Sequence, residues 1–573
     1  MQRVATGRRT FLAALLGAAL LAGAAGPARG GETVVLGCAT AADLKGLFTK
    51  IGALAEKFVP GTGAQVQGAS AMLTQGPEWA GIDWSKPATI VLFSGKGFGK
   101  AEPVPVILAG IGDAAQFRQA HPEGGPMSFE VRNDVVVLAQ DKAALAAITP
   151  ERLELYSKVP KIAGNADLYI TAYLSLAMAE YQEELEAGLK EMEQGMAGMP
   201  AVGPMANLTS IVKCIGPLVR LAGTQVRRAT MTVTFNADSL ELWGRLYAVE
   251  DTPLGTFMSG QPTEMTDLAK YLPADLVMSM AGKLDVAKAK PVVDSILQAI
   301  APAVGLTAAD QTTMRDLVFS STQTGEFAAG LAGGAANPGM QTVQVVRIGD
   351  AAKFRAATKA TTEWLMKTGI AGFMEAAGVK MTINHNPAAR EYQGIAIDRL
   401  TVTVAQAPDA PPNPLMGQQP PQVTEFAALD TLGAGVTNNP TGELLNGILD
   451  RIKGAGTPGF DTTATCKAIA AGAPKGASLA MHVSFNSLLA KVVEEMAKQQ
   501  PAIAMMAGAI IKADPAEEPI TTYVSFGANM VESRTRIPHQ PILALVTRVR
   551  AMIEQQQGPR MKGGPKPKDQ DDF

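Results

Sequence analysis

The feature that most constrains the fold of this chain is a near-repeat within it. Residues 111–120 read IGDAAQFRQA and residues 348–357 read IGDAAKFRAA, so eight of the ten positions are identical. Two weaker similarities follow in the same order: 166–176 with 477–488, and 230–258 with 521–546. A period of more than roughly 200 residues is that of a duplicated domain and not of a solenoid unit. The sequence therefore predicts a tandem duplication of one domain.

The predicted domain boundaries follow from these matches. We expect the first repeat over 31–260 and the second over 272–557, with a linker at 261–271. Residues 407–422 are a proline-rich insertion in the second repeat, interpreted as a surface loop, with a peptide-docking segment as the alternative. Residues 558–573 combine proline with charge, which predicts a disordered tail.

Hydrophobic patterns predict both strands and helices in each repeat. In the first repeat we expect strands near 33–38, 88–93, 104–109, 127–131, 134–139, 167–172, 228–236 and 239–247. Helices are expected near 41–57, 113–120, 142–149, 174–194 and 207–222. Several strands are neighbours joined by short turns, which indicates antiparallel pairing. The predicted class is α+β with mainly antiparallel sheets.

The repeated motif has a structural interpretation. Asp113 and Asp350 stand where each motif begins a helix, so each is expected to cap a helix N-terminus. An acid present in both copies also suits catalysis, but capping explains it without further assumption.

Residues 1–30 have the pattern of a secretory signal peptide. Arg3, Arg8 and Arg9 precede an apolar run over 11–25, and small residues follow. The segment Arg8-Arg9-Thr10-Phe11-Leu12 resembles the twin-arginine export motif, with an ordinary secretory signal as the alternative. The resemblance implies a bacterial protein exported in the folded state, to the periplasm or beyond. Residues 35–38 look like a lipoprotein cleavage box, but we interpret them as the first strand.

Charge argues against a nucleic-acid partner, and hydropathy argues against a membrane span after the signal peptide. Removal of residues 1–30 takes away four arginines and no acid, which lowers the formal net charge from −3 to −7. A mildly acidic chain without a basic cluster is a poor candidate for nucleic-acid binding. After the signal peptide, no apolar run reaches the length of a membrane span.

Side chains that bind metals or attack substrates are sparse. Cys38, Cys214 and Cys466 are far apart and odd in number, so spacing assigns no disulfide. The four histidines are solitary, which argues against zinc. A methionine-dense run over 192–205 suits Cu(I), but packing is the preferred interpretation. No metal or cofactor site is expected.

Two groups of short motifs resemble those of catalytic or phosphate-binding sites. The strings Ser210-x-x-Lys213, Lys367-Thr-Gly369 and Ser484-x-Asn486 are those of penicillin-binding serine hydrolases, but their order and context differ from that family. Residues 94–100 are glycine-rich and basic, which suits a phosphate-binding loop. The preferred interpretation is a hairpin connection, because the spacing is not that of a P-loop.

The remaining candidates are apolar helices at matching places in the two repeats, near 174–222 and 485–511. We predict that these helices form a surface for a ligand or a partner, with the residues Met178, Tyr181, Leu185, Met192, Met196, Met505 and Met506. We expect a non-enzymatic protein of the bacterial cell envelope that binds a hydrophobic small molecule or a protein partner, or has a structural role. The alternative is an extracytoplasmic hydrolase whose residues meet only in the fold.

Overall fold

The computed structural model describes most of the chain. The described residues are 33–76, 79–121, 127–160, 164–197, 205–321, 324–332, 340–367, 379–406, 421–439, 441–497, 505, 507–508, 510–514 and 517–556. The predicted signal peptide, the predicted tail over 558–573 and nearly all of the proline-rich insertion lie outside these residues.

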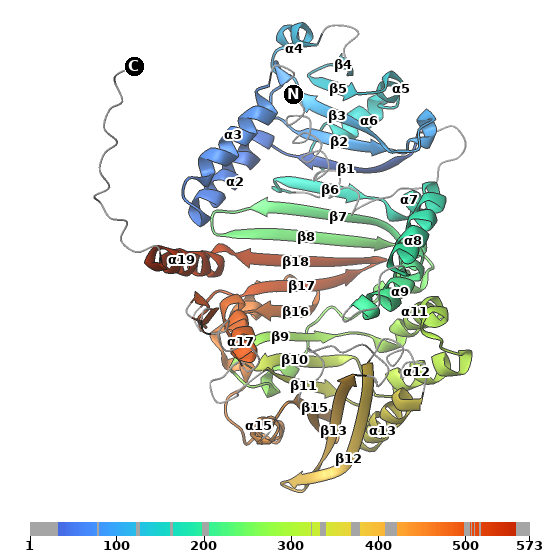
Figure 1. Cartoon of the computed structure of the whole chain (residues 1–573), viewed down its shortest axis with the longest axis vertical. Coiled ribbons are helices and arrows are strands. Elements are labelled where there is room, and N and C mark those ends of the chain that lie inside the picture. The colour runs from blue at the N-terminus through green and yellow to red at the C-terminus, as the bar shows by residue number, and fades with distance from the viewer. Residues whose placement is uncertain are drawn as a thin grey trace, which may run out of the picture.

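The described strands form one continuous antiparallel sheet (Figure 1). The amino-terminal half contributes β1 (Val35–Ala41), β2 (Ala88–Phe93), β3 (Val104–Gly110), β4 (Ser128–Arg132), β5 (Val135–Ala139), β6 (Leu168–Ala172), β7 (Val226–Phe235) and β8 (Ser239–Ala248). The carboxyl-terminal half contributes β9 (Leu276–Lys283), β10 (Glu326–Ala332), β11 (Gln341–Arg347), β12 (Val379–Tyr392), β13 (Ile395–Gln406), β14 (Gln422–Leu429), β15 (Leu432–Thr437), β16 (Ala477–Val483), β17 (Ile520–Gly527) and β18 (Met530–Pro538).

The strand order is the same in the two halves. From its outer edge inward, the first half runs β4-β5-β3-β2-β1-β6-β7-β8. The second half runs β14-β15-β11-β10-β9-β16-β17-β18, and the hairpin β12–β13 extends it beyond β14. Strands β8 and β18 pair at the centre and join the halves.

The helices of the first half are α2 (Leu44–Phe58), α3 (Thr62–Thr74), α4 (Ala114–Ala120), α5 (Lys142–Ala146), α6 (Pro150–Tyr156), α7 (Leu174–Glu180), α8 (Gln182–Ala197), α9 (Met205–Gln225) and α10 (Pro253–Met258). Those of the second half are α11 (Val286–Val304), α12 (Ala308–Ser321), α13 (Ala351–Lys367), α15 (Glu443–Ile452), α16 (Ala464–Gly472), α17 (Phe485–Ala497) and α19 (His539–Gln556). In Figure 1, α2, α3 and α19 lie to the left of the strands, and α7, α8, α9 and α11 lie to their right.

The mixture of helices with an antiparallel sheet confirms the predicted α+β class. The expected strand positions in the first half agree closely with β1 to β8, because alternating and continuous apolar runs identify strands. The expected helix over 174–194 is wrong in one respect: it is two helices, α7 and α8, separated at Tyr181. The backbone there has φ −121° and ψ 27°, outside the helical range.

Each half has its own apolar core. In the first half, β2, β3 and β5 pack against α5 and α6 around Phe93 and Ile148. In the second half, β10, β11 and β15 pack against α15 around Ile448 and Leu449. The stretch 261–271, expected as a linker, ends in a 3₁₀ turn, Leu268–Tyr271, and buries Leu268 in the second core.

The two repeated motifs form helix N-termini. The Asp113 carboxylate accepts hydrogen bonds from the backbone N–H groups of Ala115 (2.9 Å) and Gln116 (3.0 Å) at the start of α4. The Asp350 carboxylate accepts one from the N–H of Lys353 (2.8 Å) at the start of α13. Each acid satisfies backbone donors that have no partner inside the helix.

Candidate binding site

The strands that join the two halves bring together side chains from distant parts of the sequence. In the register of β8 and β18, Trp243 is opposite Arg534, Glu241 is opposite Arg536, and Arg245 is opposite Glu532. Side chains alternate between the faces of a sheet, so these six lie on one face. Strand β17 adds Thr521 and Tyr523 to the same face, because they pair with Arg536 and Arg534.

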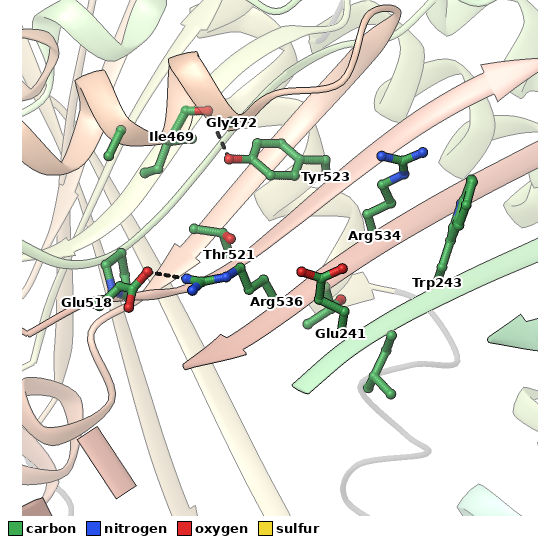
Figure 2. Close-up of a pocket in the computed structure, with 13 residues that line it drawn as sticks. Glu241, Trp243, Ile469, Gly472, Glu518, Thr521, Tyr523, Arg534 and Arg536 are labelled. Atoms are coloured by element: carbon green, nitrogen blue, oxygen red, sulfur yellow. Dashed lines mark hydrogen bonds and ion pairs between the residues drawn. The ribbon is translucent and has the colours of Figure 1, made fainter. Parts of the chain in front are cut away.

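A pocket of about 390 Å³ opens on this face at the junction (Figure 2). Its floor comes from β8, β18 and β17, and one wall comes from α16. The lining residues are Glu241, Leu242, Trp243, Ala468, Ile469, Gly472, Glu518, Pro519, Thr521, Tyr523, Arg534, Thr535 and Arg536. The pocket therefore combines apolar walls with charged side chains.

Trp243 is the centre of a cluster of arginines. The guanidinium carbons of Arg245 and Arg534 lie 3.8 Å and 4.0 Å from the centroid of its ring. Contacts of this length are cation–π interactions, which contribute roughly 0.5–2 kcal/mol each. The indole Nε1 of Trp243 is buried and has no hydrogen-bond partner among the described residues.

The arginines differ in how fully acids neutralise them. Arg245 Nε donates to Glu532 Oε2 over 2.8 Å, and both side chains are largely buried. Arg534 lies 3.5 Å from the other oxygen of Glu532, and its side chain is 47% exposed. Arg536 pairs with Asp238 (2.9 Å) and with Glu518. Arg534 is thus the most accessible positive charge in the pocket.

Tyr523 ties the wall of the pocket to its floor. Its hydroxyl donates to the backbone oxygen of Ile469 in α16 over 2.9 Å. Burial raises the pKa of Tyr523, so the hydroxyl stays neutral. A β-carbon added at Gly472 would lie 2.8 Å from this hydroxyl, so glycine permits the close approach of α16 to the sheet.

A second polar pair lies deep in the carboxyl-terminal half. The Ser279 hydroxyl lies 2.6 Å from His482 Nδ1, and the two side chains are almost fully buried. Burial lowers the pKa of His482 to about 4, and its ring stacks on Phe460 at 5.1 Å. Serine beside histidine is the pair that a serine hydrolase uses, but neither residue lines the pocket at the junction. Its surroundings are those of a buried structural contact.

The residues nominated from the sequence lie elsewhere. Tyr181 accepts a hydrogen bond from the Gly95 N–H (2.9 Å), and Lys96 lies 5.3 Å from its ring centroid. Met178 on α7 faces Gly223 of α9, and Leu185 on α8 is half-buried. Met505 is 77% exposed. The side chains of Met192 and Met196, and all of Met506, lie outside the described residues. None of the four whose side chains are described lines the pocket at the junction.

The other motifs are also separated in the structure. Ser210 belongs to α9, Lys367 ends α13, and Ser484 precedes α17. The glycine-rich residues 94–100 connect the antiparallel pair β2–β3. Its two lysines pair with acids, Lys96 with Glu184 (3.1 Å) and Lys100 with Asp141 (2.9 Å). The loop is therefore a hairpin connection with neutralised charge.

Sequence reasoning did not identify Trp243, Arg534 or Arg536 as a site. The sequence does contain one indication of this site. Glu241, Trp243 and Arg245 alternate with leucine and glycine along one strand. That pattern indicates a face that is not part of an apolar core. It does not reveal that a strand from the other half supplies the opposite side.

Metal-binding clusters of His, Cys, Asp and Glu, and membrane-spanning helices, are not found in the described part of the chain. Within the described residues, no three or more of His, Cys, Asp and Glu are grouped so that they could hold a metal. In the same part of the chain, no helix has the length and apolar character needed to cross a membrane. The three cysteines are free thiols. Comparison with protein-family models, with curated proteins and with solved structures finds no match for this chain.

Proposed function

We propose that this chain is an exported bacterial binding protein, built from two copies of one domain, that holds a small ligand in the pocket at their junction. The observation that carries the proposal is the pocket of about 390 Å³ beside Trp243 and Arg534. Its size falls within the roughly 300–1,000 Å³ of ordinary ligand pockets, and such pockets favour domain junctions.

The common strand order and the register of β8 with β18 support the duplication. In the sequence alignment, Arg245 matches Arg536 and Glu241 matches Glu532. In the sheet, Arg245 is opposite Glu532 and Glu241 is opposite Arg536. Two copies related by a two-fold axis through Trp243 and Arg534 produce this reciprocal pairing.

The lining of the pocket defines the class of ligand. Ala468, Ile469 and Pro519 provide apolar surface, and Trp243 provides a flat ring for stacking. Arg534 offers an accessible guanidinium, which prefers carboxylate or phosphate groups. A small molecule with a flat apolar body and one acidic group satisfies both parts.

Export rests on the pattern of residues 1–30 and makes periplasmic or extracellular ligands the relevant ones. The competing function is an extracytoplasmic hydrolase. Ser279 and His482 would be its first candidates, but their burial leaves no room for a substrate without a rearrangement of the second core.

The test uses residues 31–573 purified from several hosts. Mass spectrometry of denatured samples identifies any bound small molecule, and calorimetry measures binding of flat aromatic carboxylates. Arg534→Gln is expected to weaken binding by about tenfold or more, because a charge-assisted hydrogen bond is lost. Arg227→Gln is the matched control, because Arg227 is 53% exposed and lies outside the pocket. Equal affinities of the two variants, or no bound molecule from any host and no binding in the panel, would disprove the proposal.

A further inference from the structure

Three methionines from two paired strands share one face of the sheet in the carboxyl-terminal half. Strands β9 and β16 pair so that Met280 is opposite Met481 and Met278 is opposite Val483. Ser279 and His482 are also a matched pair, and their hydrogen bond places them on the face of the second core. Because side chains alternate along each strand, Met278, Met280 and Met481 lie together on the opposite face.

The spacing within this trio suits convergence on one point. Directly opposed residues such as Met280 and Met481 have β-carbons about 5 Å apart. Residues two apart on one strand, such as Met278 and Met280, are about 7 Å apart. Each methionine has three rotatable side-chain bonds, so three thioether sulfurs at these spacings can meet above the sheet.

A small pocket reaches two of the three methionines, Met278 and Met280. A space of about 300 Å³ is lined by Met278 and Met280, by apolar Ala329, Leu331 and Val343, and by polar Thr342, Gln344 and Thr437. Met481 is opposite Met280 on the neighbouring strand β16 and is not part of this lining. All three methionines are half-buried.

Of the strand neighbours on this face, Val483, Ala329 and Leu331 are apolar, whereas Thr522 is opposite Met481. Gln344 and Thr342 lie one strand further away, beyond β10. The soft donors of the site are therefore its thioether sulfurs.

The trio is specific to one half of the sheet. Strands β1 and β6 hold the matching place in the strand order, and there Ala39 is opposite Ile170. In the sequence alignment, Ile170 corresponds to Met481. The sheet is therefore built equally well without methionine at these positions, and packing alone does not require three of them.

We propose that Met278, Met280 and Met481 form a binding site for a single Cu(I) ion. Thioether sulfur is a soft ligand that selects Cu(I) over Zn²⁺ and over hard cations such as Mg²⁺ and Ca²⁺. Three neutral ligands leave the positive charge on the ion and release no proton when it binds. The affinity of the site is consequently independent of pH in the range where histidine and cysteine sites weaken through protonation.

The experiment uses the chain over 31–573 with methionine labelled with ¹³C at the ε-methyl group, in a Cys214→Ser/Cys466→Ser background. These two thiols would compete for the metal, whereas burial raises the pKa of Cys38 to about 12 and keeps it protonated. Ag(I) serves as the redox-stable probe in spectra of the methyl groups. Cu(I) affinity is then measured by competition with a chromophoric chelator at pH 5.5 and pH 7.5.

Three methyl resonances are expected to shift with one equivalent of Ag(I), and Met278→Leu, Met280→Leu and Met481→Leu identify them. Each substitution nearly conserves volume, so the fold is retained, as a thermal melt verifies. Met280→Leu is expected to weaken Cu(I) binding by about tenfold or more, equally at both pH values. Met72→Leu and Met505→Leu are the matched controls, because both methionines are exposed and lie outside this pocket.

Three results would overturn the proposal. In one, no methionine methyl shifts with Ag(I). In another, the shifts persist in Met280→Leu, which would place the site on other methionines of the chain. Affinity that falls steeply between pH 7.5 and pH 5.5 would likewise assign the metal to histidine or cysteine.

Discussion

Trp243 and Arg534 face each other across the central strand pair, and the guanidinium carbon of Arg534 lies 4.0 Å from the centroid of the Trp243 ring. On either side of them, an acid is opposite an arginine in reciprocal order: Glu241 with Arg536, and Arg245 with Glu532. The junction of the two halves is thus held by charge pairing and cation–π contact, in addition to the backbone hydrogen bonds of the sheet.

Reversal of one charge at the junction is expected to destabilise the protein. Arg245→Glu places two carboxylates opposite each other where both side chains are largely buried, at an expected cost of about 2 kcal/mol. The double variant Arg245→Glu/Glu532→Arg restores an opposite-charge pair and is expected to recover most of this loss. Unfolding in urea measures both. Equal stability of the single and double variants would contradict the prediction.

The amino-terminal half, residues 31–260, is expected to dimerise when produced alone. Without β18, strand β8 becomes an exposed edge that pairs readily with another strand. Self-pairing centred on Trp243 places Glu241 opposite Arg245 of the second copy, which reproduces the charge pattern of the junction. Light scattering after size-exclusion chromatography gives the mass. With Arg245→Glu, the new glutamate would be opposite Glu241 of the second copy, so this half should remain a monomer. If the variant still dimerises, the two copies pair through another surface.

His482 is expected to make stability depend on pH. Burial lowers its pKa in the folded state to about 4, from about 6.5 in the unfolded chain. Between these values the unfolded chain binds more protons, so the free energy of unfolding decreases as pH falls from about 6.5 to about 4. The expected loss is about 3 kcal/mol.

The matched variant for this prediction is His482→Gln. Its side chain does not titrate, and its amide can still hydrogen-bond to Ser279. Urea unfolding at several pH values should give a flatter dependence for this variant than for the parent. The same slope in both proteins would assign the effect to other groups, such as His539, whose pKa burial also lowers.

Removal of the helix caps is expected to have a modest local effect. Asp113→Ala leaves the N–H groups of Ala115 and Gln116 without their acceptor, at an expected cost of about 1 kcal/mol. Asp113→Asn retains a side-chain oxygen and serves as the control. Thermal melts compare the three proteins. Equal loss in both variants would mean that the charge, and not the cap, stabilises α4.

Export by the twin-arginine route is expected to depend on the arginine pair. Arg8→Lys/Arg9→Lys keeps the positive charge of the n-region but removes the motif. If a folded protein is exported through recognition of this motif, the variant accumulates in the cytoplasm of a bacterial host with its leader intact. Cell fractionation with mass measurement detects this outcome. Unchanged export would indicate an ordinary secretory signal.

The sequence by itself was sufficient for the local structure. The strand expected over 88–93 is β2 to the residue, because a continuous apolar run bounded by turn residues depends only on neighbours along the chain. The positions of Asp113 and Asp350 at helix starts are local in the same way. Tyr181 shows where this reasoning fails, because tertiary contacts with Gly95 and Lys96 accompany the break in the helix that periodicity predicted.

The tertiary structure determined which side chains from distant parts of the sequence lie next to each other. Arg245 and Glu532 are 287 residues apart in the chain, yet they form an ion pair of 2.8 Å. Ser279 meets His482 across 203 residues, and Met280 meets Met481 on the next strand. Periodicity indicates which face a side chain occupies, but only the pairing of distant strands sets its neighbours across the sheet. Both candidate sites, at Trp243 and at the methionine trio, depend on that pairing, and so neither could be found by reading one strand at a time.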